Sequence, residues 1–142
     1  MFAVIRLRGT VTARRKAVDT LRMLRLNRKM HCVLIQDTPS LAGMLQAVKD
    51  YVTWGEVGEE TLKKLLEKRG RKAGNRRLTS DEIAIALRAL HDGKGLKETA
   101  VKQVFRLIPA KKGFRHSIKQ HYPRGELGYR GEKINELLER MI

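Results

Sequence analysis

The stretch HCVLIQDTPS (residues 31–40) joins two structural elements without a linker. Its first part, HCVLIQ (31–36), is almost continuously apolar and predicts a strand inside a sheet. The DTPS that follows predicts a helix start, because Asp37 or Thr38 can cap it and Pro39 suits the first helical position, where no backbone N–H is needed. A strand that passes directly into a helix predicts an α/β protein.

The same alternation extends to both sides of this stretch. Upstream, FAVIRLR (2–8) is rich in β-branched residues and predicts a strand, and apolar residues spaced by four, four and three predict a helix over 13–26. Downstream, the helix is expected to reach about residue 51, where YVTWGEV (51–57) predicts a third strand. The order β-α-β-α-β predicts a two-layer α/β core over residues 1–57.

Residues 58–142 follow a different pattern and predict a mostly helical C-terminal extension, packed on the core as one domain. Amphipathic helices are predicted over 59–70, 79–90 and 132–141, the second of them opening with a capping-box spacing. VFRLIP (104–109) is compatible with a helix continuation or a strand, and its Val, Phe and Ile favour a strand.

The segment KKGFRHSIKQHYPRGELGYRG (111–131) has no helical or strand periodicity and predicts a basic glycine-rich loop. It contains six Lys/Arg against one acid, so we expect it to order only when a partner pairs its charges. Tyr129 could stack on unpaired bases or pin the loop onto the domain, and for Phe114 the pinning role is favoured.

Charge identifies the class of partner. The chain has 31 Lys/Arg against 15 Asp/Glu, for a formal net charge of +16, and such a balance indicates an anionic partner. Nucleic acid is the first candidate and a membrane surface the second. The single cysteine, Cys32, excludes an internal disulfide and predicts a core thiol in a reducing, intracellular setting. No metal-ligand spacing, nucleophile with a base, or membrane span is evident, so we expect no enzyme activity, cofactor, small-molecule substrate or membrane partner.

The basic residues fall into three clusters along the chain. Residues 1–36 hold nine Lys/Arg and one acid, residues 68–77 hold six and none, and residues 111–130 hold six and one. Solvated faces and loops are the alternative explanation, but such segregation favours a footprint on a phosphate backbone. RNA is favoured over DNA, because no helix-turn-helix, zinc finger or basic zipper pattern is present.

Several motifs together resemble one family. VLIQDTPSLAGML (33–45), LRMLRLNRK (21–29) and YVTWGE (51–56) are similar to the core of the universal large-subunit ribosomal protein thirty family. RLIPAKKGF (106–114) and LGYRGEKINELL (127–138) are similar to the C-terminal extension of its archaeal and eukaryotic members. The length, without the long N-terminal arm expected of eukaryotic members, leads us to expect the archaeal branch.

The resemblance implies a structural constituent of the large (50S) ribosomal subunit that binds and stabilises folded 23S-type rRNA beside neighbouring ribosomal proteins, in the cytoplasm. It also implies a three-stranded, largely antiparallel sheet of order 3-1-2 with helices on one face. The alternatives are a free-standing RNA-binding protein and an RNA-processing protein.

Two sources supply the candidate RNA-contacting residues. The resemblance implies contact through the first helix-to-strand turn, the basic side of the first helix and the extension: Arg25, Asn27, Arg28, Lys29, Arg14, Arg15, Arg22, Lys111, Lys112, Arg115 and Lys119. The charge clusters and their aromatic neighbour add Arg8, Arg71, Lys72, Arg76, Arg77, His116, His121, Arg124, Tyr129 and Arg130.

Overall fold

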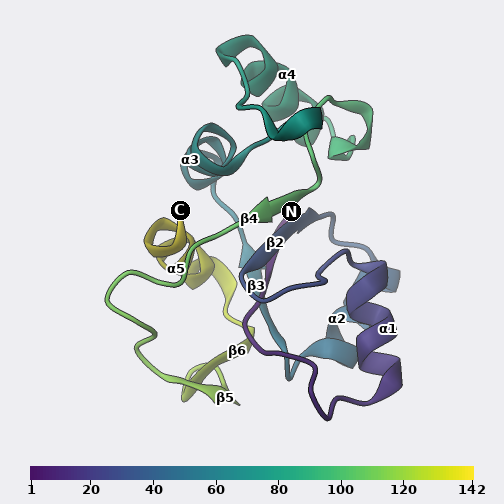
Figure 1. Cartoon of the computed structure of the whole chain (residues 1–142), viewed down its shortest axis with the longest axis vertical. Coiled ribbons are helices and arrows are strands. Elements are labelled where there is room, and N and C mark those ends of the chain that lie inside the picture. The colour runs from purple at the N-terminus through teal and green to yellow at the C-terminus, as the bar shows by residue number, and fades with distance from the viewer.

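A computed structural model describes residues 1–142 (Figure 1). The first part of the chain folds as predicted, into alternating strands and helices. These elements are β1 (Phe2–Arg6), α1 (Arg15–Met23), β2 (His31–Ile35), α2 (Pro39–Val48) and β3 (Val52–Glu56). The start of α2 confirms the expected cap: the Thr38 hydroxyl accepts a hydrogen bond from the backbone N–H of Leu41, and Pro39 is the first helical residue.

Three longer helices follow, with three single-turn helices among the connections. They are α3 (Glu59–Arg69), α4 (Ser80–His91) and α5 (Ile134–Met141), and the single turns are η1 (Ala73–Asn75), η2 (Leu96–Glu98) and η3 (Gly131–Lys133). Thr79 and Glu82 form the predicted capping box of α4. None of the helices has the length and apolar character needed to cross a membrane.

The sheet is larger than predicted. Its central strands are antiparallel in the expected order β3-β1-β2, but the whole sheet has six strands in the order β4-β2-β1-β3-β6-β5. The added strands are β4 (Val104–Arg106), β5 (Ser117–His121) and β6 (Gly125–Tyr129). β4 pairs antiparallel to β2, and β6 pairs parallel to β3. The three-stranded prediction is therefore wrong, because the extension supplies strands to edges of the central sheet that would otherwise be unpaired.

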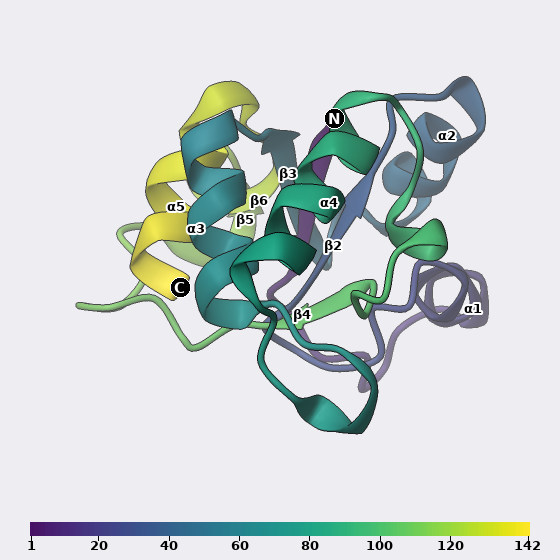
Figure 2. The same ribbon diagram turned by 90° about the horizontal axis from the view of Figure 1, so that it is seen from above.

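Helices cover both faces of the sheet, as Figures 1 and 2 show. On one face, α1 and α2 enclose a cluster that includes Val4, Leu21 and Leu45. On the other face, α3, α4 and α5 enclose a larger cluster that includes Cys32 and Phe105. The prediction that the core helices lie on one face is confirmed by α1 and α2, and the helices of the extension cover the other face.

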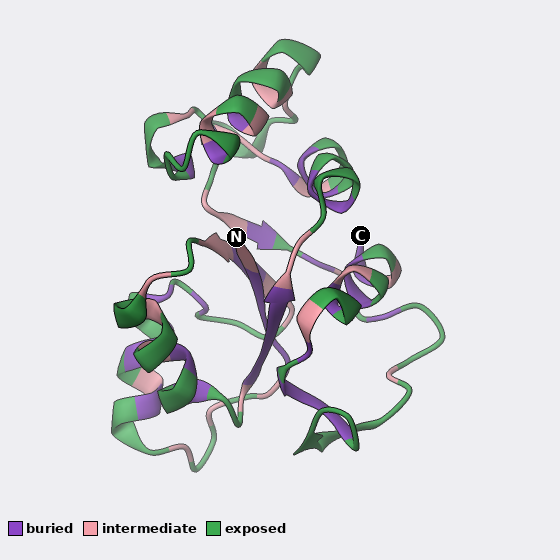
Figure 3. Ribbon diagram, turned by 180° about the vertical axis from the view of Figure 1, so that it is seen from behind, coloured by how far each residue is buried: buried purple, intermediate pink, exposed green.

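The segment 111–131 was predicted without regular structure, and that prediction is wrong for its second half. β6 is buried except at its last residue, whereas β5 is exposed throughout (Figure 3). Gly55 of β3 allows a close approach of the chain after β6, because a Cβ at Gly55 would overlap the carbonyl oxygen of Gly131. Strand β3 and the chain entering α5 are thereby brought into direct backbone contact.

Candidate nucleic-acid interface

The turn that leaves α1 presents a basic residue in a costly conformation. The backbone N–H of Leu26 donates to Leu21 O (2.8 Å) and that of Arg25 donates to Arg22 O (2.9 Å), which is a Schellman motif. Arg25 occupies the left-handed position, with φ of 61°, where glycine is usual. An arginine there costs about 1 kcal/mol relative to glycine. Glycine would avoid this cost but has no side chain. What arginine adds at this position is its exposed, positively charged side chain.

A buried arginine holds the same turn in place. Arg6, at the end of β1, is 5% exposed, and its guanidinium donates to Leu26 O (2.8 Å), to Arg8 O (2.9 Å) and to the Thr10 hydroxyl (3.2 Å). Burial lowers the pKa of Arg6 below its usual value, and no carboxylate pairs with it. Arg6 therefore acts as a positioning residue for the turn that carries Arg25, Asn27, Arg28 and Lys29.

A groove follows β4, the edge strand of the sheet. Its larger part, about 600 Å³, lies between the α1–β2 turn and the connection into β4, and a smaller part of about 190 Å³ continues towards the end of α3. The two parts share Lys102, Val104 and Arg106. We call the two parts together the β4-edge groove. Its polar lining consists of Arg25, Asn27, His31, Arg69, Arg71, Asn75, Lys97, Thr99, Lys102, Gln103 and Arg106.

The β4-edge groove joins two clusters that are far apart in the sequence. Arg25 and Asn27 come from the first basic cluster, and Arg69 and Arg71 from the second. Lys102 and Arg106, on or beside β4, lie between them, and no Asp or Glu lines either part of the groove. Six cations that line two adjoining hollows without a carboxylate make the groove a natural site for a polyanion.

The connection 70–79 pairs with itself and with the segment just before β4 instead of forming an open loop. Arg71 and Arg77 form a β-bridge, and the backbone of Lys72 pairs with that of Val101. The Lys72 ammonium donates to Glu82 on α4 (2.8 Å), which ties down one predicted RNA contact, while Arg76 and Arg77 remain exposed. The backbone of the second cluster is therefore fixed against the groove.

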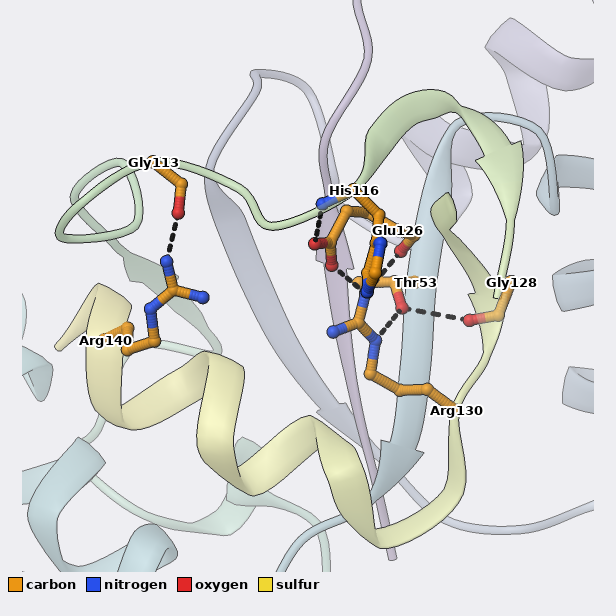
Figure 4. Close-up of polar contacts among 7 residues, drawn as sticks. All are labelled: Thr53, Gly113, His116, Glu126, Gly128, Arg130 and Arg140. Atoms are coloured by element: carbon orange, nitrogen blue, oxygen red, sulfur yellow. Dashed lines mark hydrogen bonds and ion pairs between the residues drawn. The ribbon is translucent and has the colours of Figure 1, made fainter. Parts of the chain in front are cut away.

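The third cluster has a different environment, on the far side of the sheet. Arg130 was predicted to contact RNA, but it is only 8% exposed, and its guanidinium contacts the Glu126 carboxylate (2.5 Å) and the Thr53 hydroxyl (2.9 Å), as Figure 4 shows. Burial alone would raise the pKa of Glu126, but hydrogen bonds from Arg130 and from the His116 N–H hold that pKa below 4.5. Arg130 is therefore a buried structural residue, and its assignment as a surface contact is corrected.

Other members of the third cluster divide between anchored and free side chains. The Tyr129 hydroxyl donates to Glu56 (2.6 Å) and its ring lies 6.4 Å from those of Phe2 and Trp54, which fits the pinning role, and Phe114 packs against the larger core. The His121 ring contacts Asp50 (2.9 Å). The side chains that remain exposed without a carboxylate partner are Lys111, Lys112, Arg115, His116, Lys119 and Arg124.

Comparison with known proteins decides the family. The sequence model of the family Ribosomal protein L30p/L7e matches residues 2–52. Large ribosomal subunit protein uL30 of Archaeoglobus fulgidus is 53% identical to the chain, covering 99% of both proteins. The uL30 proteins of Methanosphaera stadtmanae and Nanoarchaeum equitans are 45% and 44% identical, each over at least 99% of both chains. The chain belongs to the archaeal uL30 family.

Membership of the uL30 family confirms the resemblance found in the motifs, and the structure shows where the predicted contacts lie. Arg25, Asn27 and Arg71 line the β4-edge groove, and Arg28 is close enough to affect the His31 pKa. Exposed side chains on α1 and the adjoining turns include Arg14, Arg15, Arg22 and Lys29, and Arg8 lies over the Tyr51 ring.

Sequence reasoning missed five charged or titratable groove residues, namely His31, Arg69, Lys97, Lys102 and Arg106. Lys97, Lys102 and Arg106 stand outside the three charge clusters, His31 was counted with the apolar strand, and Arg69 was counted with the predicted helix 59–70. Arg106 could have been predicted as a candidate contact. It is a cation within a predicted apolar strand, and a charge at such a position indicates an edge strand or an uncovered face of the sheet.

Proposed function

We propose that this uL30 chain is a structural constituent of the large ribosomal subunit that binds and stabilises folded large-subunit rRNA. The observation that carries the proposal is the convergence of two distant basic clusters on the β4-edge groove, which no carboxylate lines. Family membership supports it, because the relatives are named large ribosomal subunit proteins. The role is binding without catalysis, in the cytoplasmic ribosome beside neighbouring proteins, and residues 1–57 and 58–142 act in it as one domain.

The exposed part of the third cluster supplies a second contact region. Lys111, Lys112, Arg115, Lys119 and Arg124 project from β5 and the connections around it, on the opposite edge of the sheet from β4. Two separated basic edges suit a protein that bridges two segments of a folded RNA, since each edge can neutralise a different stretch of backbone.

A salt titration tests the proposal. If roughly eight phosphates are neutralised, log K for large-subunit rRNA should fall against log[salt] with a slope of about −6 to −7. Filter binding with RNA extracted from Archaeoglobus fulgidus large subunits measures this slope. A flat salt response, or a chain that does not sediment with large subunits at low salt, contradicts the proposal.

A further inference from the structure

His31 occupies a position in the β4-edge groove that the fold alone does not explain. It is the first residue of β2 and pairs in register with Arg106 of β4. The next residue, Cys32, pairs with Ile5 of β1, and the backbone N–H of Met30, just before His31, donates to the carbonyl oxygen of Arg6 (2.7 Å). Directly opposed residues project to the same face of a sheet, so the His31 ring lies beside Arg106, and the charges of Arg28 and Arg6 also reach it. Like charges opposed in this way are destabilising unless an anion or a neutral group separates them.

His31 is neutral in this environment. Burial lowers its pKa from 6.5, and the charges of Arg106, Arg28 and Arg6 lower it further. No Asp or Glu contributes to the shift. Above that lowered pKa the ring has one N–H donor and one acceptor nitrogen.

The buried, unpaired Nδ1 of His31 indicates which ring nitrogen carries the proton. In the whole chain, only His31 Nδ1 and Arg69 Nε are buried side-chain nitrogen or oxygen atoms without a hydrogen-bond partner, and both residues line the β4-edge groove. Orphaned buried N–H groups are rarer than orphaned acceptors, so the proton is assigned to Nε2. The remaining nitrogen, Nε2, is then a donor available to a molecule in the groove.

We propose that His31 is a specificity-determining contact of this groove, where its Nε2–H donates a hydrogen bond to an uncharged oxygen on a ribose or base edge of the bound RNA. The proposal rests on the RNA-binding function proposed above. Around His31, Arg25, Lys97, Lys102 and Arg106 supply positive charge for phosphates, and such contacts position a nucleic acid without reading it. A neutral donor among these cations can recognise a ribose or base oxygen, which the phosphate contacts do not distinguish.

Salt dependence separates this role from a charge contact. Filter binding with Archaeoglobus fulgidus large-subunit RNA is measured against salt for the unmodified chain and for three variants: His31→Phe, His31→Gln and Arg106→Gln. We expect His31→Phe to weaken binding about tenfold, the worth of one hydrogen bond, with an unchanged slope. His31→Gln keeps an N–H donor and should recover most of the affinity. Arg106→Gln should make the slope shallower by about 0.7–0.9, the signature of one lost phosphate contact.

Each outcome has a separate meaning. If the unmodified chain does not bind the RNA, the proposed function fails and so does its refinement. If the chain binds but His31→Phe leaves the affinity unchanged, the His31 proposal alone is overturned. The same holds if His31→Phe makes the slope of log K against log[salt] shallower, as Arg106→Gln does. Thermal unfolding of each variant detects misfolding. Should His31→Phe fail to fold, His31→Ala replaces it, and equal affinities of the alanine and glutamine variants would overturn the proposal.

Discussion

The β4-edge groove and the C-terminal side of the sheet, residues 111–142, are both rich in arginine and lysine. The two regions differ in whether these cations have acidic or carbonyl partners within the fold. On the C-terminal side, Arg130 contacts Glu126 (2.5 Å) and Lys133 contacts Glu136 (2.9 Å). Arg140 donates to the carbonyl oxygen of Lys111 (2.9 Å) and to that of Gly113, and Figure 4 shows the second of these bonds. The β4-edge groove instead leaves its cations without any acidic lining.

This difference shows that the density of positive charge along a sequence does not by itself locate an RNA surface. Cations that the fold neutralises internally stabilise a segment, whereas cations without acidic partners remain available to a polyanion. We therefore assign the pairs around Glu126 to the stability of the fold and the β4-edge groove to binding. The following predictions test that division.

The largest effect is expected when the buried pair of the C-terminal side is broken. Glu126→Gln leaves the Arg130 guanidinium buried without its counter-charge, which should lower the free energy of unfolding by about 3 kcal/mol. Urea denaturation measures the change. The matched control is Glu136→Gln, which removes an exposed pair and should leave stability nearly unchanged. Equal effects of the two variants would contradict the division.

The same carboxylate predicts an acid dependence. The folded-state pKa of Glu126 lies below its ordinary value of 4.5, so its contribution to stability is present above pH 4.5 and is lost as the pH falls through the folded-state pKa. Denaturation at a series of acidic pH values should show this loss in the unmodified chain. Glu126→Gln should lack that part of the dependence.

The next effect concerns binding by the α1–β2 turn. Arg25→Glu with Arg28→Glu should make the salt slope for rRNA shallower by about 1.4–1.8, because two phosphate contacts are lost. Both side chains are exposed, so the melting temperature should change little. Lys64→Glu with Lys133→Glu is the control: it changes net charge equally, but at cations already paired with Glu139 and Glu136. Equal slopes for the two double variants would mean that net charge alone governs binding.

A smaller effect is expected in the titration of His31. Its pKa should lie below 6.5 in the free protein, and Arg106→Gln should move it back towards 6.5 by removing one of the three arginine charges. The lowered pKa also means that His31 contributes stability above pH 6.5 that is lost as the pH falls through the folded-state pKa. NMR titration of the ring protons measures the pKa, and a value above 6.5 would contradict the all-cationic surroundings.

The smallest effect is expected at Cys32, which lies in the sheet between the two regions. Burial raises the pKa of its thiol to about 12, so the native chain should not react measurably with a thiol reagent at pH 8. Reaction in Glu126→Gln under native conditions would report opening of the larger core. Fast reaction of the unmodified chain would show that this core is not closed.

Local features of the fold were predictable from the sequence. The Pro39 helix start and the Thr79–Glu82 capping box depend on neighbouring residues, and both appear as expected. Strand β6 was missed because its sequence, GELGY, has two glycines and a buried acid, and it becomes a strand by pairing with β3, more than 70 residues earlier. Such pairing is a tertiary effect that periodicity does not encode.

The candidate site was predictable only in part, for the same reason. Arg25 and Arg71 belong to visible charge clusters, but Lys102 and Arg106 are isolated in the sequence and join them only because β4 pairs with β2. Arg130 shows the opposite error. Its counter-charge, Glu126, is four residues away on β6, and its burial depends on Thr53 of β3.

The strand order has a consequence for how the sheet can grow on a nascent chain. β1 is made first and lies inside the sheet, with β2 and then β3 added at its two sides. β4 extends the β2 edge and β6 extends the β3 edge, so every strand after β1 except β5 finds a neighbour already synthesised. Assembly from the centre outwards, in the order of translation, therefore gives β2, β3, β4 and β6 an existing strand edge to pair with as each is made.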